Sequence, residues 1–342
     1  MKPVKPIRLF WGENYAEKPA IVKQALERAG KNSINTVHLY PGELYQEVVE
    51  LISQTLHVQP EQIVLGHGIE GLIHTTTLSF LDQSKTGGMF DPSFFVFKNN
   101  LDRYPHVYYP CRYDQTVDVK DLIAKIQRTD LFFLASPNTA TGNYLLDQSQ
   151  IERLLREYLG LLVVDECYFG IGDQTVIDLI RRYNNLMIYR GVTKVMGLAG
   201  TRLGFAVSNA NVIKKLNYHF TDIELDPVNS FALNVFKEVF PYFNILVETT
   251  NKFFTDFLEF MQTHFLDDRF IKTFTTYYFM NITRYKTQRH EVINYMNDHG
   301  YLFSSTTLHE CPKGKYPELI EITPPPQKYW EDFAQMLKKA LR

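Results

Sequence analysis

The sequence has only three cysteines, Cys111, Cys167 and Cys311, and they lie far apart. So sparse and odd a number excludes a disulfide framework and is typical of proteins from a reducing compartment. The sequence also lacks CxxC, HExxH and any closely spaced pair of histidines. We therefore expect no dedicated metal site.

Long hydrophobic runs and an excess of one charge are missing as well. No apolar run approaches the ~20 residues that cross a bilayer, and residues 1–6 lead into no hydrophobic core of a cleaved signal. The 36 Lys and Arg nearly balance the 38 Asp and Glu, so the basic excess that nucleic acid requires is absent. We expect a cytoplasmic protein that binds neither membranes nor nucleic acid.

Apolar residues, by contrast, are plentiful. Hydrophobic residues make up 45% of the 342 residues and aromatic residues 14%. This composition excludes intrinsic disorder, which is poor in aromatic side chains. The length and the apolar content together suffice for two domains, each with a buried core.

Short apolar segments that end in polar residues recur through the first two-thirds of the chain. They cover residues 62–65, 131–135, 161–164, 186–189 and 203–207. Segments with helical spacing of apolar residues, such as 44–56 and 147–158, lie between them. This alternation predicts an α/β fold whose mainly parallel sheet is flanked by helices and binds ligands beyond the carboxyl ends of its strands.

The pattern changes after about residue 235. Helical stretches at 229–239, 246–265, 286–299 and 327–341 surround fewer strand-like segments. We therefore expect a large α/β domain at 36–240 and a smaller C-terminal α+β domain at 241–342. Residues 1–35 are expected to form an N-terminal arm that packs with the small domain.

Polar clusters follow the predicted strands in a distinctive order. Asp165-Glu166-Cys167-Tyr168 ends the most apolar strand, and Lys194 follows the next one. Arg202 lies eight residues beyond Lys194, after the glycine-containing turn 197–201, and Ser136 to Gly142 follows an earlier strand. Each cluster alone is a weak signal, because caps, surface lysines and glycine turns are common. The ordered set is much more specific.

With these clusters in this order, the sequence resembles the fold-type-I pyridoxal-phosphate enzymes. Within them it is most similar to histidinol-phosphate aminotransferases and threonine-phosphate decarboxylases. The resemblance extends from Trp11-Gly12-Glu13-Asn14 to the last predicted helix. It implies pyridoxal 5′-phosphate as the cofactor and transamination between a small amino donor and a keto acceptor as the activity.

The resemblance assigns roles around the cofactor ring. It implies that Lys194 forms a Schiff base with the cofactor and then moves the substrate proton. Asp165 would pair with the pyridine nitrogen, which keeps the ring an effective electron sink. Tyr168 would donate a hydrogen bond to the 3′-oxygen, and Phe94 would stack on the ring.

The resemblance also assigns residues to the cofactor phosphate. Arg202 would bind it with a guanidinium fork and Thr193 with a hydroxyl. Gly68-Ile69-Glu70 would open a helix whose first N–H groups point at the phosphate. Tyr40 matches a tyrosine that reaches the site of the neighbouring subunit, which implies an obligate homodimer with shared active sites.

The sequence departs from the family near the cofactor at two places. The usual Asn-Pro-Thr-Gly element reads Thr139-Ala140-Thr141-Gly142. The contact to the 3′-oxygen therefore falls on Thr139 or on the preceding Asn138, and the sequence leaves both open. Gly191 stands where the family has a Ser or Thr, which removes one phosphate donor.

The departures on the substrate side are larger. Glu321 occupies the place of the arginine that clamps the substrate carboxylate, and a second family arginine falls near Ser304. Another cation could fill the role, or the strand could be turned so that Glu321 faces away. Alternatively the substrate is an amine, an amino alcohol or a cationic amino compound that Glu321 binds. We favour this last explanation, under which histidinol phosphate is a doubtful substrate.

Other residues could contribute to the substrate site. Lys313, Lys315 and Arg284 are the candidate replacement cations, and Glu13 and Asn14 are further candidates for substrate contact.

Two other activities compete with transamination. A decarboxylase uses the same cofactor and the same residues, because the bond that breaks is set by the orientation of the substrate. A catalytically silent binding protein would have no need of the complete cofactor set. A nucleotide-binding fold is less compatible still, because Gly197-Leu198-Ala199-Gly200 matches neither GxGxxG nor a Walker loop.

Overall fold

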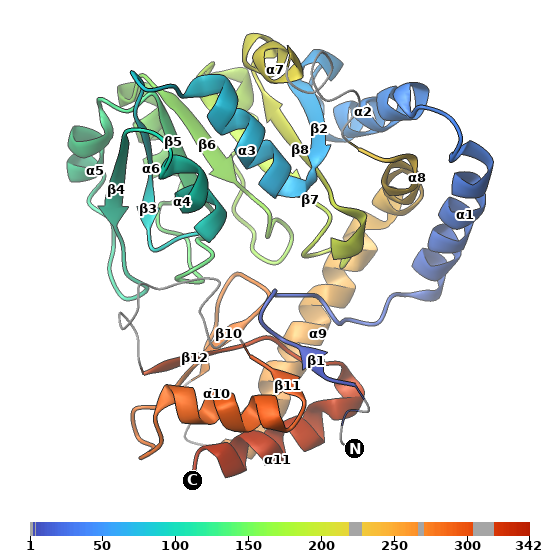
Figure 1. Cartoon of the computed structure of the whole chain (residues 1–342), viewed down its shortest axis with the longest axis vertical. Coiled ribbons are helices and arrows are strands. Elements are labelled where there is room, and N and C mark those ends of the chain that lie inside the picture. The colour runs from blue at the N-terminus through green and yellow to red at the C-terminus, as the bar shows by residue number, and fades with distance from the viewer. Residues whose placement is uncertain (1–2, 4, 219–227, 266–269, 304–317) are drawn as a thin grey trace.

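A seven-stranded sheet organises the larger of two lobes (Figure 1). The computed structural model describes residues 3, 5–218, 228–265, 270–303 and 318–342. The strands are β2 (Ile63–His67), β3 (Gly87–Asp91), β4 (His106–Pro110), β5 (Leu131–Ala135), β6 (Leu161–Asp165), β7 (Leu186–Gly191) and β8 (Leu203–Ser208). Their order is β2-β8-β7-β6-β5-β3-β4. Strand β8 runs antiparallel to both neighbours and the other pairs are parallel, so the predicted mainly parallel sheet is confirmed.

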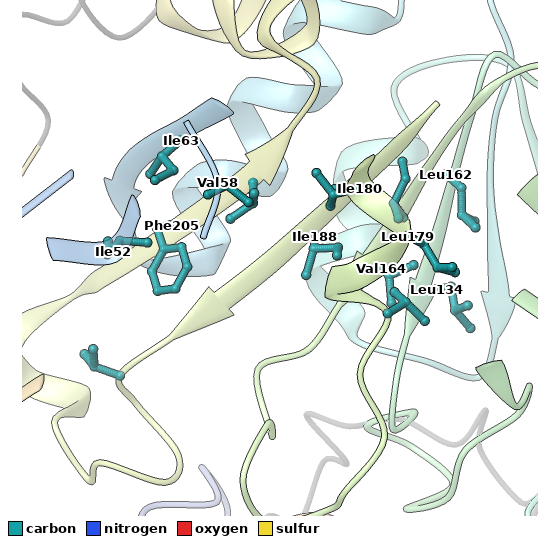
Figure 2. Close-up of a cluster of buried hydrophobic side chains, with 14 of the residues drawn as sticks. Ile52, Val58, Ile63, Leu134, Leu162, Val164, Leu179, Ile180, Ile188 and Phe205 are labelled. Atoms are coloured by element: carbon teal, nitrogen blue, oxygen red, sulfur yellow. The ribbon is translucent and has the colours of Figure 1, made fainter. Parts of the chain in front are cut away.

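Side chains of the central strands point alternately to the two faces of the sheet, and both faces are buried. Leu134, Leu162 and Val164 lie on one face (Figure 2), whereas Phe133 and Val163 belong to a second cluster on the other. The first face is covered by α2 (Gly42–Leu56), α5 (Val119–Ile126), α6 (Gln148–Glu157) and α8 (Ser230–Val239). The second is covered by α3 (Gly68–Phe80), α4 (Phe95–Leu101) and α7 (Ala210–Asn217). Burial on both faces explains the uninterrupted apolar runs of these strands.

The smaller lobe has its own sheets and its own core. An antiparallel sheet of order β12-β10-β9 is formed by β9 (Phe270–Ile271), β10 (Tyr278–Asn281) and β12 (Leu319–Ile322). Helices α10 (Arg289–Asp298) and α11 (Trp330–Ala340) pack in this lobe, and α9 (Phe243–His264) runs from the larger lobe into it (Figure 1). Along α9, Leu246 lies in the first core and Phe257 in the second. No helix in the described ranges is both long and apolar enough to cross a membrane.

The N-terminal residues contact both lobes. Strand β1 (Ile7–Arg8) pairs in parallel with β11 (Tyr301–Leu302) of the smaller lobe. Helix α1 (Ala20–Thr36) packs instead against α8, where Arg28 pairs with Glu238 at 2.8 Å. Only the first part of the predicted arm therefore lies with the smaller lobe. The domain boundaries near residues 35 and 240 remain a proposal.

Candidate active site

The polar clusters meet in one cavity of about 500 Å³ at the carboxyl edge of the sheet. Asp165 is the last residue of β6, and Lys194 lies three residues beyond β7. Strand β8 is antiparallel, so Arg202, just before its start, reaches the same edge. The predicted site residues that line the cavity are Glu13, Ile69, Glu70, Phe94, Thr139, Asp165, Tyr168, Thr193, Lys194 and Arg202. Residues separated by almost 190 positions are thus brought together.

The amine of Lys194 lies at the floor of this cavity and contacts the N-terminal segment. Its Nζ atom donates a hydrogen bond to the carbonyl of Trp11 at 2.9 Å and lies 5.4 Å from the centre of the Tyr168 ring. Burial lowers the pKa of Lys194, and this effect is opposed by nearby groups that include Cys167 and Glu321. A lowered pKa increases the neutral amine fraction, which is the form that attacks a carbonyl.

Asp165 presents a buried carboxyl group beside Lys194. Its side chain accepts a hydrogen bond from the backbone N–H of Cys167 at 2.9 Å, and the residue is only 1% exposed. Burial raises the pKa of Asp165 to about 7, although the Cys167 hydrogen bond and Lys194 act in the opposite direction. A protonated heterocyclic nitrogen placed here would supply the cationic donor that favours the carboxylate form. This chemistry fits the pyridine nitrogen of pyridoxal phosphate.

The loop after β5 presents Thr139, rather than Asn138, to the cavity. The Asn138 amide donates to the carbonyl of Pro92 at 3.1 Å, and its oxygen accepts from the N–H of Ala140 at 2.8 Å. These bonds occupy both ends of its side chain and hold the loop.

Tyr168 is fully buried, and burial raises the pKa of its phenol well above the usual value, so the phenol stays protonated as a donor.

Arg202 and the N-terminus of α3 form a cradle at one end of the cavity. Helix α3 begins at Gly68, as predicted, and Arg202 donates to the Glu70 carboxylate at 3.0 Å. A Cβ atom at Gly68 would lie 3.2 Å from the guanidinium, and one at Gly204 would lie 2.9 Å from the Ile69 nitrogen. The guanidinium and the first helical N–H groups can therefore approach each other closely. Such an arrangement fits a phosphate group.

Gly191 packs beside the side chain of Ile69 in this cradle. A Cβ atom at Gly191 would lie 3.3 Å from the Ile69 side chain, so Ile69 fills the space beside it. Thr193 lines the same end of the cavity. Position 191 therefore lies against an apolar side chain, in place of the hydroxyl group that the family has there.

The N-terminal segment forms another part of the wall. Glu13 lines the cavity and accepts hydrogen bonds from Nε of Arg8 at 2.9 and 3.2 Å. Asn14 instead donates from its amide to the carbonyl of Lys194 at 2.9 Å and to the Thr250 hydroxyl at 2.8 Å. The structure therefore places Asn14 as a brace for the lysine loop. Arg8 was not found by sequence reasoning, because no motif surrounds it.

Glu321 lies on β12, opposite Phe279 of β10. Burial raises its pKa to about 8, while the charges of Arg289 and Lys194 lower it. Glu321 is not one of the described residues that line the cavity, although its charge and that of Lys194 interact. Of the other substrate candidates, Arg284 is exposed. Ser304, Lys313 and Lys315 lie outside the described residues.

Tyr40 lies apart from the cavity and is 90% exposed. The neighbouring side chains Ile34, Val37 and Leu39 are also exposed. Together these four residues form an apolar surface between α1 and α2, which we call the α1–α2 surface. Within this chain, Tyr40 therefore contributes nothing to the cavity that its own Lys194 lines.

A buried ion pair supports the loops that carry the site. The Glu166 carboxylate accepts from Nη2 of Arg190 at 2.9 Å and from the N–H of Val176 at 2.7 Å, and the Arg190 guanidinium lies 3.7 Å from the centre of the Phe169 ring. Both members of the pair are buried. Because Glu166 follows Asp165 and Arg190 is the next-to-last residue of β7, the pair joins the two segments that present Asp165 and Lys194. Sequence reasoning assigned it no role.

Comparisons with known proteins match this arrangement. The family model for aminotransferase class I and II matches residues 5–219. The chain belongs to this family. A histidinol-phosphate aminotransferase of Carboxydothermus hydrogenoformans is 31% identical over 250 residues, which cover 70% of this chain and 68% of that protein. One of Thermoanaerobacter pseudethanolicus is 31% identical over 59% of this chain, and the match spans 58% of that relative's length.

Solved structures of this family share the fold across both lobes. Histidinol-phosphate aminotransferase of Sinorhizobium meliloti, solved with pyridoxal-5′-phosphate, gives a TM-score of 0.84 at 17% identity and covers 99% of this chain and 91% of that one. L-threonine-O-3-phosphate decarboxylase of Porphyromonas gingivalis gives 0.77 at 17% identity, with 97% and 98% covered. The predicted fold-type-I architecture, with a large α/β lobe and a smaller C-terminal lobe, is therefore confirmed. In the described parts of this family member, no group of three or more His, Cys, Asp or Glu could hold a metal.

Proposed function

We propose that this protein is a pyridoxal-phosphate-dependent aminotransferase in which Lys194 holds the cofactor covalently. The observation that carries the proposal is the convergence of Lys194, Asp165 and Arg202 on one cavity. When bound, the cofactor supplies an electron sink for the bond to the amino-bearing carbon. In the net reaction, an amino donor and a keto acceptor exchange the amino group and the carbonyl oxygen.

Different residues of the cavity would bind different parts of the cofactor. Asp165 would hold the ring nitrogen, Tyr168 and Thr139 would contact the 3′-oxygen, and Phe94 would pack against the ring. Lys194, as a free amine, would take the proton from the donor's amino-bearing carbon and deliver it to the cofactor carbon that keeps the amino group, because its lowered pKa lets the amine act as a base.

At the phosphate, three features combine. Arg202 supplies a guanidinium fork, Thr193 supplies a hydroxyl, and Gly68-Ile69-Glu70 supply helical N–H groups. Glu70 would compete with the phosphate for Arg202, since its carboxylate accepts a hydrogen bond from Nη2 of Arg202 in this structure.

For the donor we propose a small amine, amino alcohol or cationic amino compound. The relatives are named for histidinol phosphate. A positively charged donor near Glu321 would favour the carboxylate form of this residue and be attracted to it, whereas an anionic donor would gain no such attraction. Glu13, which lines the cavity and pairs with Arg8, is a second carboxylate that acts on Lys194.

A donor panel tests the activity and the role of Glu321 together. Purified protein is loaded with pyridoxal phosphate, and its visible absorbance is followed as amines, amino alcohols and amino acids are added singly. We expect bleaching by an uncharged or cationic amine, and a higher KM for that donor in Glu321→Gln. Bleaching only by amino acids would contradict the role of Glu321. Release of CO₂ without consumption of a keto acid would identify a decarboxylase instead.

We further propose a homodimer in which Tyr40 enters the partner's site. The 90% exposure of Tyr40 and the apolar α1–α2 surface support it. Mixing the inactive variants Lys194→Ala and Tyr40→Ala tests it, because a mixed dimer would contain one intact site. Random exchange should restore about a quarter of the sites. No recovery after exchange would contradict shared sites.

A further inference from the structure

The cavity wall contains a charged pair that the proposed chemistry does not use. Arg8, on β1, and Glu13, five residues later, both line the cavity, together with Trp11. The two side chains are joined by hydrogen bonds from Nε of Arg8 at 2.9 and 3.2 Å and by a contact from Nη2. The Arg8 backbone is fixed by its pairing with Leu302 and by a 2.7 Å hydrogen bond from the Tyr15 hydroxyl to the Arg8 carbonyl.

The charges around the cavity single out Arg8. Among the described residues that line it, the cations are Arg8, Lys194 and Arg202. Under the proposed function, Lys194 is linked to the cofactor and Arg202 is bound to its phosphate. Arg8 is then the lining cation that remains for a substrate.

An amino-group exchange needs a keto acceptor, and the common keto acceptors carry a carboxylate. Glu13 and Glu70 both line the cavity, so that carboxylate would meet like charges there unless a cation binds it. An arginine fork is well suited to a carboxylate, because it offers two parallel N–H donors.

We propose that Arg8 binds the carboxylate of the keto acceptor and that Glu13 occupies the guanidinium until the acceptor arrives. This inference rests on the proposed aminotransferase function. Under this proposal, a different residue recognises each substrate: Glu321 the amino donor, and Arg8 the anionic acceptor. The arginine clamp that is missing at position 321 is then supplied from the N-terminal segment.

Three variants test the proposal by direct binding. Protein loaded with pyridoxal phosphate, which does not exchange an amino group with a keto acid, is titrated with 2-oxoglutarate while tryptophan fluorescence is recorded, since Trp11 lines the same cavity. Arg8→Gln should weaken binding by about 10-fold or more, because a charge-assisted, bidentate contact is lost. Glu13→Gln should strengthen binding, because the competing carboxylate is gone. Arg28→Gln removes a similarly exposed arginine that pairs with Glu238 elsewhere, and should change nothing.

Kinetics provide the second measurement. Protein loaded with pyridoxamine phosphate is mixed with 2-oxoglutarate or with propanal, which lacks the carboxylate. Arg8→Gln and Arg8→Lys should raise the KM for 2-oxoglutarate, with Lys the milder change, and leave the reaction with propanal at the parent rate. An equal loss with both acceptors would overturn the proposal, since it would indicate a general structural role for Arg8.

The outcomes separate this proposal from the proposed function. If the parent reacts with keto acids and Arg8→Gln keeps the parent's KM and binding constant, Arg8 is not the clamp although the protein is an aminotransferase. If Glu13→Gln weakens binding as much as Arg8→Gln does, Glu13 is not a competitor and that part is wrong. If the parent reacts with no donor and no acceptor, the proposed function fails, and binding of 2-oxoglutarate that depends on Arg8 still shows an anion site.

Discussion

Gly204 is expected to control the phosphate cradle although it contacts no substrate. It lies on β8, opposite Gly66 of β2, directly under the first turn of α3. A Cβ atom there would lie 2.9 Å from the Ile69 nitrogen and 3.0 Å from the carbonyl carbon of Gly68. Both are backbone atoms, so neither can turn aside as a side-chain end could. Gly204→Ala must therefore displace the N-terminus of α3.

The size of the effect follows from the overlap. Overpacking of this kind costs about 1–3 kcal/mol. In the free protein α3 relieves the strain by moving away, and cofactor binding then has to bring it back. The dissociation constant for pyridoxal phosphate should therefore rise by about 5- to 150-fold, which is the same free energy expressed as affinity. The assay is titration of cofactor-free protein with pyridoxal phosphate, followed by visible absorbance.

Gly30→Ala provides the matched control. Gly30 lies within α1, and a Cβ atom there would have no atom within 4 Å. The same chemical change should leave cofactor affinity unaltered and increase stability slightly, because alanine favours a helix over glycine by about 1 kcal/mol. Cofactor affinity of Gly204→Ala equal to that of the parent would refute the view that close packing on β8 holds the phosphate cradle.

Two further predictions concern buried charge. Arg190→Met leaves the Glu166 carboxylate buried without its guanidinium, so the free energy of unfolding should fall by about 3–5 kcal/mol. The control is Arg182→Met, which breaks an exposed pair and should lower the midpoint of urea denaturation far less. Burial raises the pKa of Asp165 to about 7, above the value of this carboxyl group in the unfolded chain. The stability that the protonated carboxyl group contributes is therefore fully present in acid and is lost as pH rises towards 7. Cofactor-free Asp165→Asn should therefore lose less stability than the parent between pH 5 and 8, and parallel urea midpoints for the two proteins would contradict this.

The strands, and the convergence of the polar clusters on one edge of the sheet, could be predicted because their signals are local. Residues 131–135 read as an all-apolar strand and form β5 with the same bounds. The Asp165-to-Arg202 spacing pointed to one site because strand ends share an edge of the sheet. By contrast, β3 escaped prediction: it begins with Gly87-Gly88, which weakens a strand pattern. A Cβ atom at Gly88 would lie 2.6 Å from Phe132, so the glycine reflects packing against β5 that sequence periodicity does not record.

Long-range contacts account for the rest of what the sequence did not predict. Strand β8 lies between β2 and β7 and runs antiparallel to both, a direction that its own apolar pattern does not record. The position of Asn138 could not be decided because both of its hydrogen-bond partners had to be known. Arg8 reaches the cavity only because β1 pairs with β11, almost 300 residues later. The buried Glu166–Arg190 pair likewise joins the segment after β6 to the end of β7, a contact that the apolar pattern of the sequence does not record.

The role of Lys194 as the residue that holds the cofactor is tested most directly by one spectrum. Parent protein and Lys194→Ala are each mixed with pyridoxal phosphate, dialysed, and scanned in the visible range before and after addition of an amino donor. The parent should retain a band that the donor bleaches, whereas Lys194→Ala should remain folded, form no covalent band and support no turnover. A Lys194→Ala protein with the parent's band and the parent's activity would contradict the assignment of this cavity as the cofactor site.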